Sequence, residues 1–325
     1  MTYYNIFLKK GKCSNCSNSI VIQRKYSGQT LCHSCFMVSI EKIIRKTISK
    51  YEMLNRNDRI IVALSGGKDS FSLLYNLNQI QKKKQHSQPL IALTIDEGIK
   101  DYRNHSIKNA VKICEELEIE HKILSFKKRV GYTLDEIIEK KKKLPGYKYA
   151  CNYCATIRRR LLNDGTRELD GTILAMGHNL TDFAETFLMN ILYKRLYLIA
   201  NQYIFKDEKL KISQYFVKKI SPLMRIPEEE IFLYANLKKF DYYPSHCPYR
   251  EKDPILRKKV LDFILQCKKT SPEIEFNLLN GFLDLSSILY NKIERDQHHR
   301  CHICGYPCRN DQVCSYCNLL KELKN

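Results

Sequence analysis

The stretch that most limits what this chain can fold into is Arg59–Leu74, RIIVALSGGKDSFSLL. Its first half is a short β-branched and apolar run, which suits a buried parallel strand better than a helical turn. Its second half places apolar side chains at helical spacing, and two adjacent glycines separate the halves. The pattern predicts a strand, a tight turn and a helix, in that order.

The turn itself is suited to binding an anion. Gly66 and Gly67 let the backbone bend sharply and approach a ligand, while the free N–H groups and the positive dipole end of the helix face the turn. Ser65 and Ser70 add hydroxyl donors, and Lys68 can neutralise phosphate charge. The loop is not a Walker A sequence, because GxxxxGK followed by Ser or Thr is absent.

Further strands and helices alternate along the chain, which predicts a doubly wound, mainly parallel α/β sheet. The expected strands are Ile60–Leu64, Leu90–Ile95, His121–Phe126 and Gly171–Met176, with another ending near Ile220–Leu223. Such sheets bind ligands at the carboxyl ends of their strands. Asp96 and His178 each follow a predicted strand, and Asp182 lies near the start of the next helix. We therefore expect these three side chains at the ligand-binding edge.

The chain of 325 residues carries a formal net charge of +20, which favours a polyanionic partner. Many cations cluster in one segment among tyrosines, a combination suited to phosphate contacts and base stacking. The cations are Lys122, Lys127, Lys128, Arg129, Lys140–Lys143, Lys148 and Arg158–Arg160, and the tyrosines are Tyr132, Tyr147, Tyr149 and Tyr153. The four lysines at 140–143 fit a solvated helix face equally well.

The fourteen cysteines point to metal binding rather than to disulfides. Eight of them form two sets of paired knuckles, Cys13-x2-Cys16 with Cys32-x2-Cys35 and Cys301-x2-Cys304 with Cys314-x2-Cys317. Each set supplies the four thiolates of a tetrahedral zinc ribbon, so we expect two Zn2+ ions. Nearby residues that are not needed to complete either site are His33, His298, His299, His302 and the ambiguous Cys308.

These ribbons divide the chain into three predicted parts: an N-terminal ribbon at 1–37, a catalytic α/β domain at 38–270, and a helical segment with the C-terminal ribbon at 271–325. A helix at Val38–Tyr51 is expected to join the first ribbon to the first strand. No apolar run reaches the ~18–20 residues of a membrane span. Residues 1–12 also lack the apolar segment of a secretory signal, so we expect a soluble, cytoplasmic protein without a membrane partner.

Cys151 and Cys154 form a further pair at the predicted start of a helix that continues with Arg158–Arg160. The helix dipole and the three guanidinium groups favour thiolates there, which predicts a reactive or metal-bound pair. Three cysteines remain single: Cys247, in a loop between two prolines, and Cys114 and Cys267, which we expect to pack against apolar neighbours.

Taken together, these residues resemble the tRNA 2-thiouridine synthetases of the TtuA type and their archaeal and eukaryotic cytosolic relatives, a branch of the PP-loop ATP pyrophosphatases. The resemblance covers nearly the whole chain. Besides both ribbons and the central cysteine pair, it rests on Ser65–Ser70, Asp96–Gly98, Gly177–Thr186, Met189, Asn190, His246–Tyr249 and Cys304–Pro307. It implies an enzyme, a tRNA-uridine 2-sulfurtransferase, which adenylates uracil O2 with ATP and then replaces that oxygen with sulfur.

The resemblance also implies the residues of the site. ATP with Mg2+ would be bound by Ala63, Leu64, Ser65, Gly66, Gly67, Lys68, Asp69, Ser70, Asp96, Gly177 and His178. Cys151, Cys154 and Cys247 would hold a [4Fe-4S] cluster whose fourth iron has no protein ligand. Lys68, Arg158 and Asp182 would be catalytic, Lys68 by offsetting charge at the phosphates and the others by orienting substrate or transferring protons.

The implied partners are tRNA, a sulfur donor and a second copy of the chain in a homodimer. The donor is either a ubiquitin-like thiocarboxylate protein or sulfide. The chain departs from the family at Thr181, where relatives often carry the first aspartate of an Asp-Asp pair, at Ala155, a usual glycine, and at Tyr193–Arg195. Any magnesium role of the aspartate pair then falls to Asp182 alone.

Other interpretations stay open on the sequence. A 2-thiocytidine synthetase of the TtcA type shares the chemistry but not the paired terminal ribbons. A thiolase without a cluster would carry a persulfide on Cys154 or Cys247, and a zinc site with three cysteines would add His246. A non-enzymatic alternative is a zinc-ribbon RNA-binding protein with a vestigial nucleotide site, against which the intact Ser65–Ser70 string argues.

Overall fold

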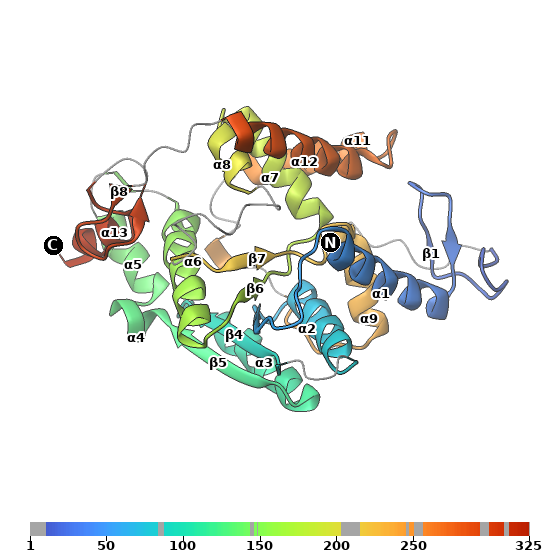
Figure 1. Cartoon of the computed structure of the whole chain (residues 1–325), viewed down its shortest axis with the longest axis horizontal. Coiled ribbons are helices and arrows are strands. Elements are labelled where there is room, and N and C mark those ends of the chain that lie inside the picture. Colours follow the sequence, from blue (N-terminus) through green and yellow to red (C-terminus); the bar gives the residue numbers. More distant parts are fainter. Residues whose placement is uncertain are drawn as a thin grey trace.

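A five-stranded parallel sheet lies at the centre of the computed structural model, which describes residues 11–83, 88–143, 146–147, 149–202, 215–244, 247–249, 256–292, 299–308 and 312–324 (Figure 1). In spatial order the strands are β5 (Glu120–Ser125), β4 (Ile91–Asp96), β3 (Ile60–Ala63), β6 (Ile173–Ala175) and β7 (Lys218–Ile220). The predicted parallel α/β sheet is confirmed.

Helices cover both faces of the sheet, because successive strand residues point to opposite sides. Val62 packs in one apolar core with residues of α2, whereas its neighbour Ile61 packs in a second core with residues of α6. The first face carries α1 (His33–Lys50), α2 (Lys68–Gln81), α3 (Arg103–Leu117) and α9 (Glu228–Leu237). The second carries α4 (Phe126–Val130), α5 (Leu134–Lys142), α6 (Ala150–Glu168) and α13 (Ser315–Lys324).

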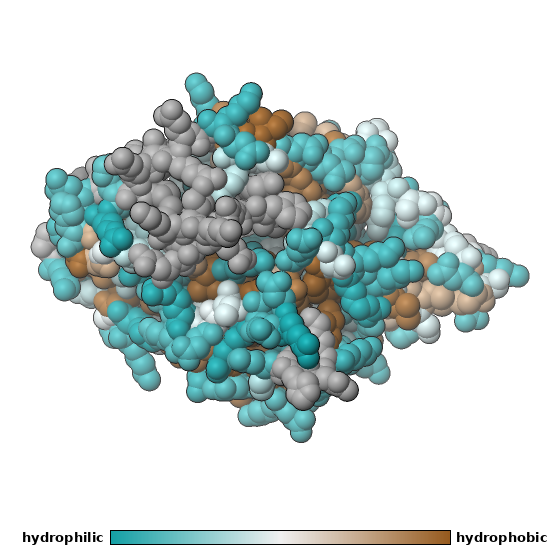
Figure 2. All heavy atoms as spheres, in the orientation of Figure 1, coloured by the Kyte–Doolittle hydropathy of each residue, from teal (hydrophilic) through white to brown (hydrophobic). Residues whose placement is uncertain are grey.

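Four further helices form a layer beyond the sheet, at the top of Figure 1. They are α7 (Leu180–Leu192), α8 (Leu196–Asn201), α11 (Leu256–Cys267) and α12 (Ile274–Lys292). Figure 2 shows that hydrophilic side chains cover most of the face in view, with hydrophobic side chains exposed over α8 and α12. Among the described residues, no helix has the length and apolar character needed to cross a membrane.

The order of the strands reverses between β3 and β6. β3, β4 and β5 follow one another outward on one side, and the chain then returns to place β6 on the other side of β3. At such a switch point the loops that follow two neighbouring strands diverge and leave room for a ligand. These two loops contain Ser65–Gly67 and Gly177–Asn179, so the topology brings two predicted parts of the site together.

A buried ion pair joins the N-terminal ribbon, with β1 (Ile22–Gln23) and β2 (Thr30–Leu31), to the sheet domain. The Nε and Nη2 atoms of Arg24 donate to the carboxylate of Glu230 on α9 at 3.1 and 2.6 Å. α1 begins at His33 rather than at the predicted Val38, so the second cysteine knuckle opens this helix. One apolar core runs from Cys13 in the ribbon to Phe282 on α12. The three predicted domain ranges stay a prediction.

Candidate active site

The predicted anion-binding turn lies between β3 and α2. Gly66 has a φ of +88°, and a Cβ at this position would lie 2.3 Å from the carbonyl oxygen of Ser106. Only glycine fits such a position without strain. Gly67 is the N-cap of α2 and has no side chain to cap it, so the first N–H groups of the helix remain available to an anion. The Oγ atoms of Ser65 and Ser70 lie 3.1 Å apart beside these N–H groups.

Lys68, the first residue of α2, is held by two carboxylates. Its Nζ lies 2.8 Å from Asp69 Oδ2 and 2.9 Å from Glu228 Oε1. Burial acts to lower the pKa of Lys68, but the charges of Asp69 and Glu228 outweigh it and raise that pKa. Lys68 is therefore a fixed cation beside the turn, and phosphate oxygens can replace the half-exposed Glu228 as its partner.

The loop after β6 is tied to this turn. A Cβ on Gly177 would lie only 3.2 Å from the backbone nitrogen of Ser70, so the two backbones pass close together. Asn179 caps α7 and also donates from Nδ2 to Asp69 Oδ1 at 3.0 Å. Asp182 completes the capping box by accepting from the backbone N–H of Asn179. The turn and α7 thus form one rigid edge.

Two polar residues that the sequence singled out complete this edge. His178 directly precedes the N-cap of α7, where desolvation lowers the pKa of its imidazole, although the charge of Asp182 opposes that effect. Its ring is therefore neutral at pH 7 and can accept a proton. Asp96 ends β4 and accepts from the backbone N–H of Gly98 at 2.9 Å. These positions agree with the expectation that both side chains follow strand ends.

Thr181, the departure from the family pattern, has a structural role here. It is buried, and its Oγ1 donates to Glu275 Oε1 on α12 at 2.6 Å while accepting from the backbone N–H of Glu228 at 3.2 Å. An aspartate at this position would place a second carboxylate against the buried Glu275. The threonine and Glu275 therefore belong together. Asp182, the second position of the family's Asp-Asp pair, keeps its carboxylate, and its Oδ1 lies 3.2 Å from Arg257 Nη2.

Two buried charged residues that the sequence analysis missed connect this edge to the central cysteines. Arg103 donates to the carbonyl of Ser65 at 2.9 Å, and its Nε lies 2.7 Å from Glu97 Oε2. Glu97 Oε1 lies in turn 3.6 Å from Arg158 Nη1. The position of Glu97 directly after a predicted strand could have marked it as a site residue. Nothing in the sequence distinguishes Arg103 from any other arginine in the first turn of a helix.

The central thiols lie beside one another but not in single-ion geometry. Cys151 and Cys154 occupy the first turn of α6, and the charges of Cys151 and Cys247 both act on Cys154. Cys154 and Cys247 also pack against the same apolar core. The three thiols are nevertheless not all within 4.8 Å of one another, unlike the ribbon thiols. The three central thiols are therefore not gathered around a single tetrahedral position as the ribbon thiols are.

At Cys154 the expected effect of the arginines on the thiol is present, but burial outweighs it. Burial raises the pKa of the Cys154 thiol to about 12, although the charge of Arg158 acts to lower it. Arg160 is directed elsewhere, since its Nη1 lies 3.5 Å from the Sγ of Cys304 in the C-terminal ribbon. A metal bound by Cys154 must therefore displace the thiol proton.

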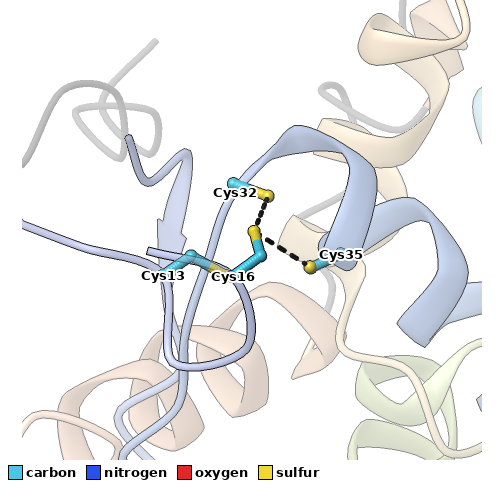
Figure 3. A group of neighbouring side chains, drawn as sticks. All are labelled: Cys13, Cys16, Cys32 and Cys35. Carbon is cyan, nitrogen blue, oxygen red and sulfur yellow. Dashed lines mark hydrogen bonds between the residues drawn. The ribbon is translucent and has the colours of Figure 1, made fainter. Parts of the chain in front are cut away.

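Both terminal cysteine sets are spaced for a single ion. Cys13, Cys16, Cys32 and Cys35 converge in one ribbon (Figure 3), and Cys301, Cys304, Cys314 and Cys317 converge in the other, with β8 (His299–Arg300) and β9 (Pro307–Cys308). Burial acts to raise the pKa of Cys13, but backbone N–H groups, including that of Asn15 at 3.4 Å, lower it to about 6. Four converging thiols with one already acidic fit a structural metal site. The two ribbons lie at opposite ends of the long axis (Figure 1).

The basic segment is only partly available to a polyanion. Lys141 is buried and paired with Glu322 on α13. The Nζ of Lys140 lies 4.4 Å from the ring centroid of Tyr132. A third lysine of the four, Lys143, pairs with Glu139 at 3.5 Å, whereas Tyr149 and Arg159, nearer the cysteines, are exposed.

Stability should depend on pH through Glu185, one turn along α7 from Asp182. Burial raises the pKa of Glu185 from 4.5 to about 7, although Arg257, with Nε 2.5 Å from Oε2, opposes this. Because the folded state holds this proton more tightly than the unfolded chain, the Glu185 contribution stabilises at low pH and is lost as pH rises from about 4.5 to 7. Glu185→Gln has no such proton.

We expect the free energy of unfolding of the Glu185→Gln variant, relative to the wild type, to increase between pH 5 and pH 7.5. The slope should be at most about 1.4 kcal/mol per pH unit. Urea unfolding at several pH values measures it. A difference that is the same at pH 5 and pH 7.5 would show that Glu185 titrates normally in the folded protein.

The turn, the switch point and the fixed lysine define a PP-loop ATP-binding protein, and a family model described as the PP-loop domain matches residues 37–262. A protein of Methanocaldococcus jannaschii named "Probable sulfurtransferase" is 37% identical over 99% of this chain and 92% of its own length. The tRNA 2-thiolation protein NcsA of Haloferax volcanii is 31% identical over 96% and 99%. The chain belongs to the PP-loop tRNA 2-thiolation proteins, a family of sulfurtransferases.

A solved structure resembles the whole molecule. The U34-tRNA thiolase NcsA from Methanococcus maripaludis, determined with its [4Fe-4S] cluster, has a TM-score of 0.80 and 34% sequence identity. The likeness covers 97% of each chain. It therefore extends over both ribbons and the helical layer as well as the sheet.

Proposed function

We propose that this chain is an ATP-dependent tRNA thiolase that converts a uridine of tRNA to 2-thiouridine. The observation that carries the proposal is the line of contacts from Ser65 in the ATP-binding turn through Arg103 and Glu97 to Arg158 beside Cys154. Base activation and sulfur transfer need such proximity, because the activated base must meet the sulfur before water does. The related NcsA, a U34-tRNA thiolase, supports the substrate class.

The reaction would take two steps. Uracil O2 attacks the α-phosphorus of ATP, the bond to the β-phosphate breaks, and pyrophosphate leaves. Hydrosulfide then attacks C2, the bond between C2 and the adenylated oxygen breaks, and AMP leaves with that oxygen. The hydrosulfide proton is released, so the base gains sulfur and loses oxygen without a change in redox state.

The residues of the edge would divide this work. The N–H groups and hydroxyls of Ser65–Ser70 hold the pyrophosphate, while Ala63, Leu64, Asp96 and Gly177 line the nucleotide. Lys68 offsets the charge that develops on the phosphates. Asp69 and Asp182 would share the Mg2+ ion of the nucleotide, and Arg158 would orient the base. The neutral ring of His178 is a candidate acceptor for the released proton.

The cysteines fit the metals that the family resemblance implies. Cys151, Cys154 and Cys247 offer three neighbouring thiols, and thiolates are the usual ligands of a [4Fe-4S] cluster. When bound, such a cluster would supply an open iron that holds the sulfur to be transferred. Each terminal ribbon would hold one Zn2+ ion as a structural centre. A ubiquitin-like thiocarboxylate protein or sulfide would supply sulfur, and a cytoplasmic homodimer is part of the same proposal.

The direct test is an anaerobic reaction of cluster-reconstituted protein with ATP, sulfide and unmodified tRNA, followed by digestion and mass spectrometry of the nucleosides. We expect 2-thiouridine together with AMP and pyrophosphate. A 2-thiocytidine product would move the chain to the cytidine enzymes. No thionucleoside from protein that binds both ATP and the cluster would overturn the proposal and favour an RNA-binding role.

A further inference from the structure

Two neighbouring cations, one on α6 and one on the edge strand β7, stand out on the surface. Arg159 and Lys219 are both exposed, and neither forms an ion pair with any residue that the structure describes. The electrostatics agree: after desolvation, the charge of Arg158 lowers the pKa of Arg159, and the charge of Arg159 lowers the pKa of Lys219. Positive charge gathered without compensation is a cost that an anionic ligand relieves.

The packing of α6 against β7 places the two cations together. Asn163 on α6 donates from Nδ2 to the carbonyl of Tyr215 at 2.8 Å and accepts from the backbone N–H of Val217 at 3.0 Å. Arg159 lies one helical turn before Asn163, and Lys219 lies two residues after Val217 on the same side of its strand. Both side chains therefore lie next to the Asn163 contact, displaced from it towards the carboxyl ends of the strands, where the catalytic site lies.

The C-terminal ribbon completes this surface with aromatic and basic side chains. Arg160 lies 3.9 Å from the ring centroid of Tyr306 in the ribbon, and that ring packs edge-on against Phe216 at 5.0 Å. Phe216, directly before β7, is 41% exposed. The guanidinium of Arg300 lies 5.4 Å from the ring centroid of Tyr215. Figure 1 shows the ribbon beside α5 and α6 at one end of the molecule.

We propose that Arg159 and Lys219 bind a backbone phosphate of the RNA substrate, on a surface that α6, β7 and the C-terminal ribbon form together. This proposal rests on the proposed tRNA thiolation. ATP is the other source of phosphate, but its phosphates belong at the turn after β3. β7 is two strands away from β3, about 10 Å across the sheet. The exposed ring of Phe216 adds a stacking surface for a base, which ATP bound at the turn does not need.

The test compares two double variants with equal loss of charge. Arg159→Gln with Lys219→Gln removes the proposed site. Lys82→Gln with Lys83→Gln removes two exposed cations directly after α2, at the end of that helix away from the ATP-binding turn. Fluorescence anisotropy with labelled tRNA measures binding at several salt concentrations. We expect the first variant to bind tRNA roughly tenfold more weakly, with the slope of log K against log salt reduced by about 0.7–0.9, as loss of one phosphate contact predicts. The control should change by less than about twofold.

Three further readouts make the outcome decisive. Zinc content and thermal unfolding should match the wild type in both variants, and Arg159→Lys, which keeps the charge, should retain most tRNA binding. ATP affinity should be unchanged; weaker ATP binding with normal tRNA binding would assign the site to the nucleotide and overturn the proposal. If the first double variant binds tRNA as tightly as the wild type, this phosphate site is refuted, but the proposed function is not. Failure of the wild type to bind tRNA would refute the proposed function itself.

Discussion

Replacing Cys247 with alanine is expected to abolish thiolation while leaving ATP binding intact. The substitution removes one of three thiols that would hold the cluster, and Cys247 lies outside the turn that binds ATP. Changes behind a metal ligand already alter affinity or activity 10- to 100-fold, so loss of a ligand should lower the yield of 2-thiouridine by more than about a hundredfold. Iron content, visible absorbance after reconstitution and nucleoside mass spectrometry measure the effect.

Cys267→Ala is the matched control, because this single cysteine ends α11 and belongs to none of the metal sets. It should keep cluster, ATP binding and product. If Cys247→Ala loses the product but retains a full complement of iron, Cys247 acts through a persulfide. Unchanged thiolation in the same variant would remove Cys247 from the site altogether.

Gly66→Ala should destabilise the protein by about 3 kcal/mol or more and abolish ATP binding. The φ of +88° is strained for alanine, and the new Cβ would lie 2.3 Å from the carbonyl oxygen of Ser106. That oxygen is backbone within α3 and cannot rotate away as a side chain could. Urea unfolding without nucleotide measures the loss of stability, and titration with ATP measures the loss of binding.

The neighbouring glycine supplies the control. Gly67 has a φ of −99°, and a Cβ there would meet only Ser65 Oγ, at 3.6 Å. Gly67→Ala should therefore cost less than about 1 kcal/mol in the absence of nucleotide. Equal losses of stability in the two variants would mean that the turn does not require the left-handed conformation of Gly66.

Local patterns in the sequence were sufficient for the parts of the site that are continuous in the chain. The strand, turn and helix around Ser65–Ser70 follow from side-chain periodicity and two glycines. The spacing of the cysteine knuckles was enough to predict that each set of ribbon thiols converges. Alternation of strands and helices was enough for the parallel sheet. These features depend on contacts between residues near in sequence, which propensity and spacing describe directly.

The tertiary structure decided what depends on distant residues meeting. Arg103 bridges Ser65 and Glu97, Lys141 is buried against Glu322, and Arg159 comes beside Lys219 on the edge strand. The raised pKa of Cys154 likewise comes from burial, which outweighs the nearby arginine. Burial and charge pairing arise only when separate elements pack together, so neither the spacing of residues nor their local propensities could predict them.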